Sequence, residues 1–217
     1  MSPTSVFGRN SQGGIIRNPV LKTSVNAFYH SDYEGGGNWK IQGTIENLIC
    51  TFKNDITPYP FMTLLYAQTR LKSILNTDLP EILKFTGLST LCVCVIPRAK
   101  EENTYSENQK LFRKTVQETI CNLNGFIDGT YFIIRHTNTK TTHLSRHGNG
   151  GDGAMPYPGI TKDTCTISDE VVGKNILLID DLYTKTVNID EDAIQALFDK
   201  GAKSVYFYSI GKTVSKY

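Results

Sequence analysis

The pattern of apolar and polar residues predicts a strand–helix–strand unit near the C-terminus of this chain. Residues 176–179, Ile-Leu-Leu-Ile, form an uninterrupted apolar run, which indicates a strand buried on both faces, as in a parallel sheet. Residues 189–200 place apolar side chains at helical spacing, carry acids in the first turn, and are followed by Gly201 as a stop signal. Residues 203–210 are predicted to form a second strand. The unit is therefore βαβ and predicts an α/β fold.

Helical periodicity also marks the first half of the chain. Apolar residues from Ile41 onward predict a helix that ends near Phe52. Two further helices are expected at 61–75 and 79–85, with Pro80 in the first turn of the second. Strands are predicted at 90–96, 131–135 and 164–168, and another helix at 106–123. Residues 1–38 contain short apolar patches typical of strands or of an extended arm, so we expect an N-terminal arm or hood before a domain at 39–217.

Composition narrows the class of protein. At 217 residues, with 39% hydrophobic and 20% charged residues, the chain is expected to form one ordinary globular domain. A formal charge of +2 argues against a polyanion binder, so nucleic acid is not expected as a partner. The five cysteines include no C-x-x-C pair, which favours free thiols in a cytoplasmic protein. No segment resembles a signal peptide or a membrane span, and no residue is assigned as a metal ligand.

Two adjacent acids, Asp180 and Asp181, follow the buried apolar run. In open α/β sheets, ligands bind at the carboxyl ends of the strands, where these acids are expected. A carboxylate pair there can accept hydrogen bonds from neighbouring sugar hydroxyls, and the following turn and helix N-terminus suit a phosphate. The alternative is a strand that ends in surface acids before a capped helix.

Residues 177–188, LLIDDLYTKTVN, resemble the signature loop of the type I phosphoribosyltransferases, in which a hydrophobic run and two acids precede a Thr-Thr-Gly-x-Thr turn. The resemblance implies that Asp180 and Asp181 hold the ribose hydroxyls of phosphoribosyl pyrophosphate (PRPP). It also implies that the next turn binds the 5′-phosphate; this turn consists of Thr184, Lys185, Thr186, Val187 and Asn188.

This turn departs from the family pattern at several positions. Thr186 stands where the family has glycine, and a β-branched residue restricts the close approach of backbone to phosphate. Lys185 either places its ammonium group on the phosphate or is solvated in a degenerate loop. Asn188 is expected to cap the helix that follows.

A second candidate site follows the strand at 90–96. Arg98, Ala99 and Lys100 lie just past its end, ahead of a helix that begins near Asn108-Gln109. This arrangement resembles the pyrophosphate loop of the ComF-like, amidophosphoribosyltransferase-like branch of the family. The alternative is that these cations are solvated loop charges. The glycine-rich segment 136–163 resembles the family's flexible catalytic loop, which implies that Lys140 or Arg146 neutralises the leaving pyrophosphate.

The resemblance covers roughly residues 39–213 and implies a type I phosphoribosyltransferase-like domain, with a twisted, mostly parallel sheet, flanking helices and a hood. It implies Mg²⁺-dependent binding of PRPP and, in an enzyme, transfer of the ribosyl phosphate to a nitrogen nucleophile. Two other hypotheses stay open. One is a PRPP or nucleotide sensor without turnover, which the altered Lys185-Thr186 pair favours. The other is an effector subunit, for example of a bacterial defence or toxin system, whose residues 1–40 contact a partner; a homo-oligomer also stays open.

Overall fold

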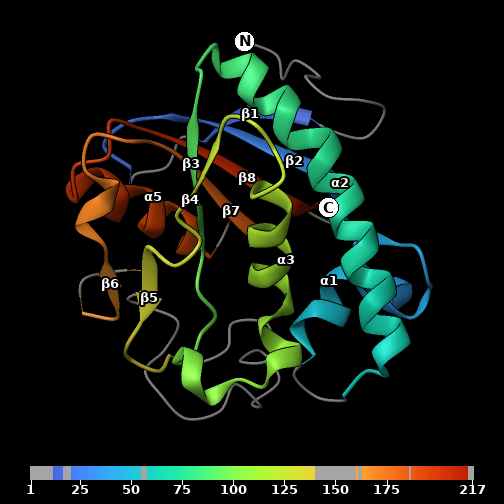
Figure 1. The fold of residues 1–217 in the computed structure, drawn as a ribbon. Helices are drawn as coiled ribbons and strands as arrows, with labels where there is room; N and C mark the ends of the chain where they lie inside the picture. The colour runs from blue at the N-terminus through green and yellow to red at the C-terminus, as the bar shows by residue number, and fades with distance from the viewer. Residues whose placement is uncertain are drawn as a thin grey trace.

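A six-stranded sheet runs through the centre of the computed structural model, with strand order β1-β2-β8-β7-β3-β4 (Figure 1). The structure describes residues 12–16, 21–54, 58–139, 160, 163–185 and 187–214. β1 pairs antiparallel with β2, and the other neighbouring strands are parallel. The strands are β1 (Gln12–Ile16), β2 (Val25–Tyr33), β3 (Leu91–Val95), β4 (Phe126–Asp128), β7 (Asn175–Tyr183) and β8 (Ser204–Thr213). The parallel α/β sheet predicted from the sequence is confirmed.

Helices cover both faces of this sheet (Figure 1). On one face α1 (Ile45–Lys53), α2 (Phe61–Thr86) and α3 (Leu111–Ile120) pack against a cluster that includes Leu177 and Ile179 of β7. On the other face α5 (Ile189–Asp199) packs against a cluster that includes Ile176 and Leu178. Successive residues of a strand point to opposite faces, so both sets of β7 side chains must be apolar. This explains the uninterrupted apolar run at 176–179.

The helix α2 replaces the two helices that were predicted at 61–75 and 79–85. Pro80 lies inside it and cannot donate the helical hydrogen bond of that turn. Leu71, Leu75 and Leu79, however, are each 0% exposed in the core. We conclude that burial of this continuous apolar face outweighs the lost hydrogen bond.

The helix α1 begins later than the periodicity predicted. Ile41 is 57% exposed and lies before the helix. The helix starts at Ile45 because Thr44 caps it: the Thr44 hydroxyl oxygen accepts a hydrogen bond of 3.1 Å from the backbone N–H of Asn47.

Two smaller features complete the fold. The strands predicted near 131–135 and 164–168 are confirmed as β5 (Ile133–Arg135) and β6 (Cys165–Ile167), which pair antiparallel in a separate two-stranded sheet. Within the expected N-terminal segment, β2 is a strand of the main sheet and pairs with β8.

Short 3-10 helices lie at Gly36–Lys40, Glu102–Thr104, Glu107–Lys110 and Asp169–Val171. None of the helices in the described part of the chain has the length and apolar character to cross a membrane.

Candidate functional site

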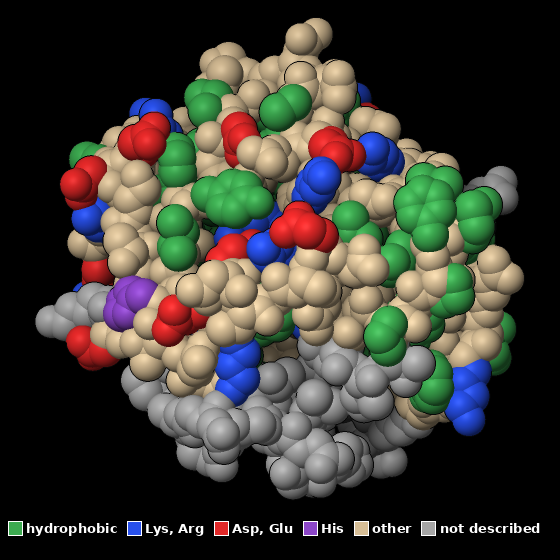
Figure 2. Space-filling model, turned by 60° about the horizontal axis from the view of Figure 1, so that its bottom comes forward, with side chains coloured by type: hydrophobic (Ala, Val, Ile, Leu, Met, Phe, Trp, Pro, Cys, Tyr) green, Lys and Arg blue, Asp and Glu red, His purple; other side chains and the backbone are tan. Residues whose placement is uncertain are grey.

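A cavity of about 540 Å³ opens at the carboxyl edge of the main sheet. Figure 2 turns this side of the molecule toward the viewer and shows acidic and basic side chains close together near the centre of the face. The wall combines the ends of β2 and α1, the segment after β3, the end of β5, and the stretch from β7 into α5. Strand ends and a helix start therefore meet around one hollow, as expected for a ligand site in an α/β fold.

The cavity brings together about half of the site residues predicted from the sequence. Six of them line it: Arg98, Ala99, Asp180, Asp181, Thr184 and Val187. Lys100, Lys185 and Asn188 are described but are not part of its lining. Lys140, Arg146 and Thr186 lie outside the described residues, as does the glycine-rich run at 148–159.

The two acids belong to the strand β7 and not to a loop. β7 continues to Tyr183 because β8 goes on pairing with it, with Asp180 opposite Ser209 and Leu182 opposite Gly211. The ladder between β7 and β3 ends earlier, at the pair Val95–Ile179. The acids therefore lie past the end of β3, where one side of β7 is open to the cavity.

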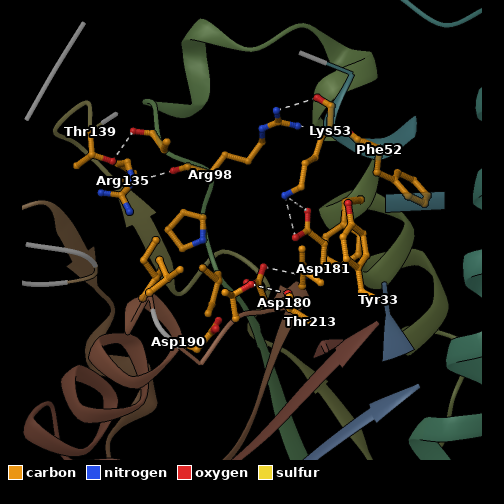
Figure 3. A pocket seen from close by; sticks show the side chains of 18 of the residues that line it. Tyr33, Phe52, Lys53, Arg98, Arg135, Thr139, Asp180, Asp181, Asp190 and Thr213 are labelled. Carbon is orange, nitrogen blue, oxygen red and sulfur yellow. Dashed lines mark hydrogen bonds and ion pairs between the residues drawn. The ribbon is translucent and has the colours of Figure 1, made fainter. Parts of the chain in front are cut away.

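Strand alternation places the two acids in different surroundings. Asp181 points to the face that α1 covers, and Asp180 points to the face that α5 covers. Each acid meets one charged or ionisable partner there, Lys53 from α1 and Asp190 from α5 (Figure 3). The motif treats the acids as equivalent, but the structure gives them different neighbours.

Lys53 forms an ion pair with Asp181 at the cavity wall. Its Nζ atom lies 3.0 Å from Asp181 Oδ1 and 2.7 Å from Asp181 Oδ2. Burial lowers the pKa of Lys53, but the Asp181 and Asp180 carboxylates outweigh burial and raise this pKa above its usual value. The lysine is therefore held in its charged form beside the acids. The sequence pattern around Lys53 does not predict this role, because its partner is 128 residues away.

Asp190, in the first turn of α5, lies within hydrogen-bond reach of Asp180. Its side chain is only 4% exposed and lines the cavity. Burial, followed by the charge of Asp181, raises the pKa of Asp180 to about 7, although Lys53 acts in the opposite direction. Burial and the charge of Asp180 raise the pKa of Asp190 well above its usual range. Asp190 was also missed, because acids at a helix start have a general explanation in the helix dipole.

Arg98 holds the cavity wall together through backbone carbonyls. Its guanidinium group donates hydrogen bonds to the carbonyl oxygens of Lys53 (2.8 Å), Gln109 (3.1 Å) and Phe52 (3.3 Å). It also lies 4.5 Å from the ring centroid of Tyr105. These contacts join the end of α1, the 3-10 helix at Glu107–Lys110 and the segment after β3. Its role in the described structure is thus to position the wall of the cavity.

The turn between β7 and α5 is closed by its own backbone. Val187 N–H donates to the Thr184 carbonyl oxygen at 3.0 Å, and the Thr184 and Thr213 hydroxyl groups lie 2.8 Å apart. Asn188 occupies the position before α5 in a left-handed conformation, with φ of 57°. The expectation that it caps the helix is wrong in the described chain, because no cap hydrogen bond to its side chain is present. Lys185 is exposed.

Among the described residues, no group of three or more His, Cys, Asp or Glu side chains is arranged to hold a metal ion.

Neither a scan against protein-family models nor a search of curated proteins returns a match for this chain.

Proposed function

We propose that this protein binds PRPP, or a closely related ribosyl phosphate, together with Mg²⁺ in the cavity at the carboxyl edge of the sheet. In this proposal the fold is that of a type I phosphoribosyltransferase. The observation that carries the proposal is the meeting of three motif segments at one cavity. The acids of β7, the turn before α5 and the segment after β3 all contribute to its wall.

The chemistry of the wall supports a role for each segment. Asp180 and Asp181 present carboxylate oxygens, which accept hydrogen bonds from the ribose hydroxyls. The N-terminus of α5, which follows the turn after β7, offers backbone N–H groups to the 5′-phosphate. Lys53 and Arg135 are described cations that line the cavity and are the candidates to face the pyrophosphate group. Arg98 also lines it, but its guanidinium group donates to three backbone carbonyls.

In the enzyme form of this proposal, a nitrogen nucleophile attacks the anomeric carbon of PRPP. A nitrogen–carbon bond forms, the carbon–oxygen bond to pyrophosphate breaks, and pyrophosphate leaves with the bonding electron pair. Stabilising the leaving group needs cations aimed at it. The proposed residues for this task, Lys140 and Arg146, lie outside the described part of the chain.

A second candidate is a PRPP or nucleotide sensor that binds without turnover. One observation favours it: Lys185, which replaces a family threonine, is exposed and is not among the residues lining the cavity. The altered turn therefore places no described lysine on the phosphate position. An effector subunit that binds a partner protein is the third hypothesis, and it requires no ligand in this cavity.

Calorimetry separates these three functions. The full chain is titrated with PRPP in the presence of Mg²⁺, with ribose 5-phosphate and pyrophosphate as separate controls. Pyrophosphate release is then measured across a panel of bases and amines. Saturable PRPP binding with release supports the enzyme, and binding without release supports the sensor. No PRPP binding refutes both and leaves the effector hypothesis.

A further inference from the structure

The side chain of Asp190 combines deep burial with an unsatisfied acceptor. Asp190 is only 4% exposed. Within the described part of the chain, its Oδ1 atom has no hydrogen-bond partner. A buried carboxylate oxygen without a partner is costly, since it has lost water and gained no donor. The residue is part of the lining of the cavity.

Asp190 also lies against a second acid. Its carboxyl group is within hydrogen-bond reach of the Asp180 carboxyl group, and two carboxyl groups this close cannot both be ionised in a buried site without a balancing charge. Lys53 is a nearby described cation, and both oxygens of Asp181 already bind its ammonium group. The Asp180–Asp190 pair therefore needs a positive charge or a proton between its oxygens.

We infer that Asp180 and Asp190 bind one divalent cation of the Mg²⁺ class at the wall of the cavity. This inference rests on the proposed function, which supplies the phosphate ligand that completes the coordination of the cation. It assigns a role to Asp190, which lies outside the motif. The two carboxylates supply the protein ligands, and water or oxygen atoms of the ligand fill the remaining positions. The cation removes the repulsion between the carboxylates and gives Asp190 Oδ1 a partner.

The donor set favours magnesium over other metals. The described residues that line the cavity include no histidine and no cysteine, which argues against zinc and copper. No described group of three or more His, Cys, Asp or Glu side chains is present, so the described part of the chain offers no cage of several carboxylates of the kind that calcium prefers. Magnesium is commonly held by one or two carboxylates, several waters and the phosphates of a substrate. A site of this kind binds the cation weakly alone and more tightly with a phosphate ligand.

The test uses Mn²⁺ as a paramagnetic probe, without any phosphate ligand. The full chain is titrated with Mn²⁺ and free Mn²⁺ is followed by electron paramagnetic resonance, with Mg²⁺ added as a competitor. We expect one saturable site from which Mg²⁺ displaces Mn²⁺. Asp190→Asn and Asp180→Asn are each expected to weaken Mn²⁺ binding by roughly tenfold or more, the loss of one charge-assisted contact.

Asp192→Asn is the matched control. Asp192 lies in the same first turn of α5 and loses the same charge, but it does not line the cavity. Its affinity for Mn²⁺ is expected to stay close to wild type. If Asp190→Asn does not fold, the wild-type protein still gives an answer: Mn²⁺ should broaden amide NMR signals most strongly near Asp180 and Asp190. Broadening centred elsewhere overturns the inference.

The remaining outcomes separate this inference from the proposed function. No saturable Mn²⁺ binding, or undiminished binding by Asp190→Asn, means that the two carboxyl groups share only a proton, and the inference fails. Mg²⁺-dependent PRPP binding that Asp190→Asn leaves unchanged, without a Mn²⁺ site in the free protein, leaves the proposed function standing, because the cation then enters with the ligand. A metal site in a protein that does not bind PRPP leaves the inference standing and refutes the proposed function.

Discussion

The Nζ atom of Lys53 lies 2.7 Å from Oδ2 of Asp181, and this ion pair joins the last residue of α1 to the end of β7. The two side chains are 23% and 18% exposed, so water screens the pair only in part. It fixes the position of α1 relative to the acids that we assign to ligand binding.

The first prediction concerns the ion pair itself. Lys53→Gln and Asp181→Asn, made singly and together, should show a coupling free energy of about 1 kcal/mol, because the pair is only partly screened. Chemical denaturation of the wild type, the two single variants and the double variant gives the four free energies of unfolding from which the coupling free energy is calculated. The equivalent cycle for Lys72 and Glu118, a more exposed ion pair, should give a smaller value. Additive effects at Lys53 and Asp181 would show that the pair does not stabilise this wall.

The second prediction concerns ligand recognition by Asp181. Asp181→Asn keeps the side-chain shape but removes a charged acceptor for a ribose hydroxyl group. A hydrogen bond to a charged group is worth roughly 1.5–3 kcal/mol, so PRPP affinity should fall by about one to two orders of magnitude. Calorimetry measures this loss. Asp199→Asn, at the far end of α5 and outside the cavity, serves as the control. Equal affinities for both variants would remove Asp181 from the site.

The third prediction concerns Lys185, which departs from the family pattern. Because its side chain is exposed and does not line the cavity, Lys185→Ala should change PRPP affinity by less than about twofold. Measuring at low and high salt excludes a screened long-range contribution. A tenfold loss that salt partly masks would instead identify Lys185 as a direct phosphate partner.

The fourth prediction concerns Arg98 as a structural residue. Arg98→Ala removes hydrogen bonds to three carbonyl groups and should lower the free energy of unfolding by roughly 3 kcal/mol. Arg98→Lys should recover little, because an ammonium group does not reproduce the planar fork of donors. Lys114→Ala, at an exposed position of α3, is the control for loss of a cation. Wild-type stability in Arg98→Ala, combined with lost PRPP binding, would favour the pyrophosphate role.

The sequence predicted best the elements whose packing leaves a local pattern. The β7–α5–β8 unit was found because a strand covered on both faces must be apolar at every position. The left-handed stop at Gly201, with φ of 104°, is likewise a local requirement. In contrast, Pro80 suggested a break in α2 that tertiary packing overrides, and β4 is only three residues long. Neither the continuity of α2 through Pro80 nor the short strand β4 can be predicted from the neighbouring residues in the sequence.

The sequence predicted residues of the candidate site only where the motif covers it. Asp180 and Asp181 were identified from their place after an apolar run, and the structure adds that they point to opposite faces of the sheet. Lys53 and Asp190 were missed for different physical reasons. Lys53 reaches the site through a contact between segments far apart in the chain, and Asp190 has the composition of any helix start. Only the packed structure distinguishes these side chains from solvated charges.

The opposite orientation of Asp180 and Asp181 has a consequence for how any ligand is held. A molecule that engages both carboxylates must lie across the rim of β7, in contact with the helical layers on the two sides of the sheet. Its binding should therefore slow amide hydrogen exchange at the end of α1 and at the start of α5 together. A fragment that reaches only one carboxylate should protect one helix and leave the other unchanged, so the exchange pattern reports how far a ligand extends over the sheet.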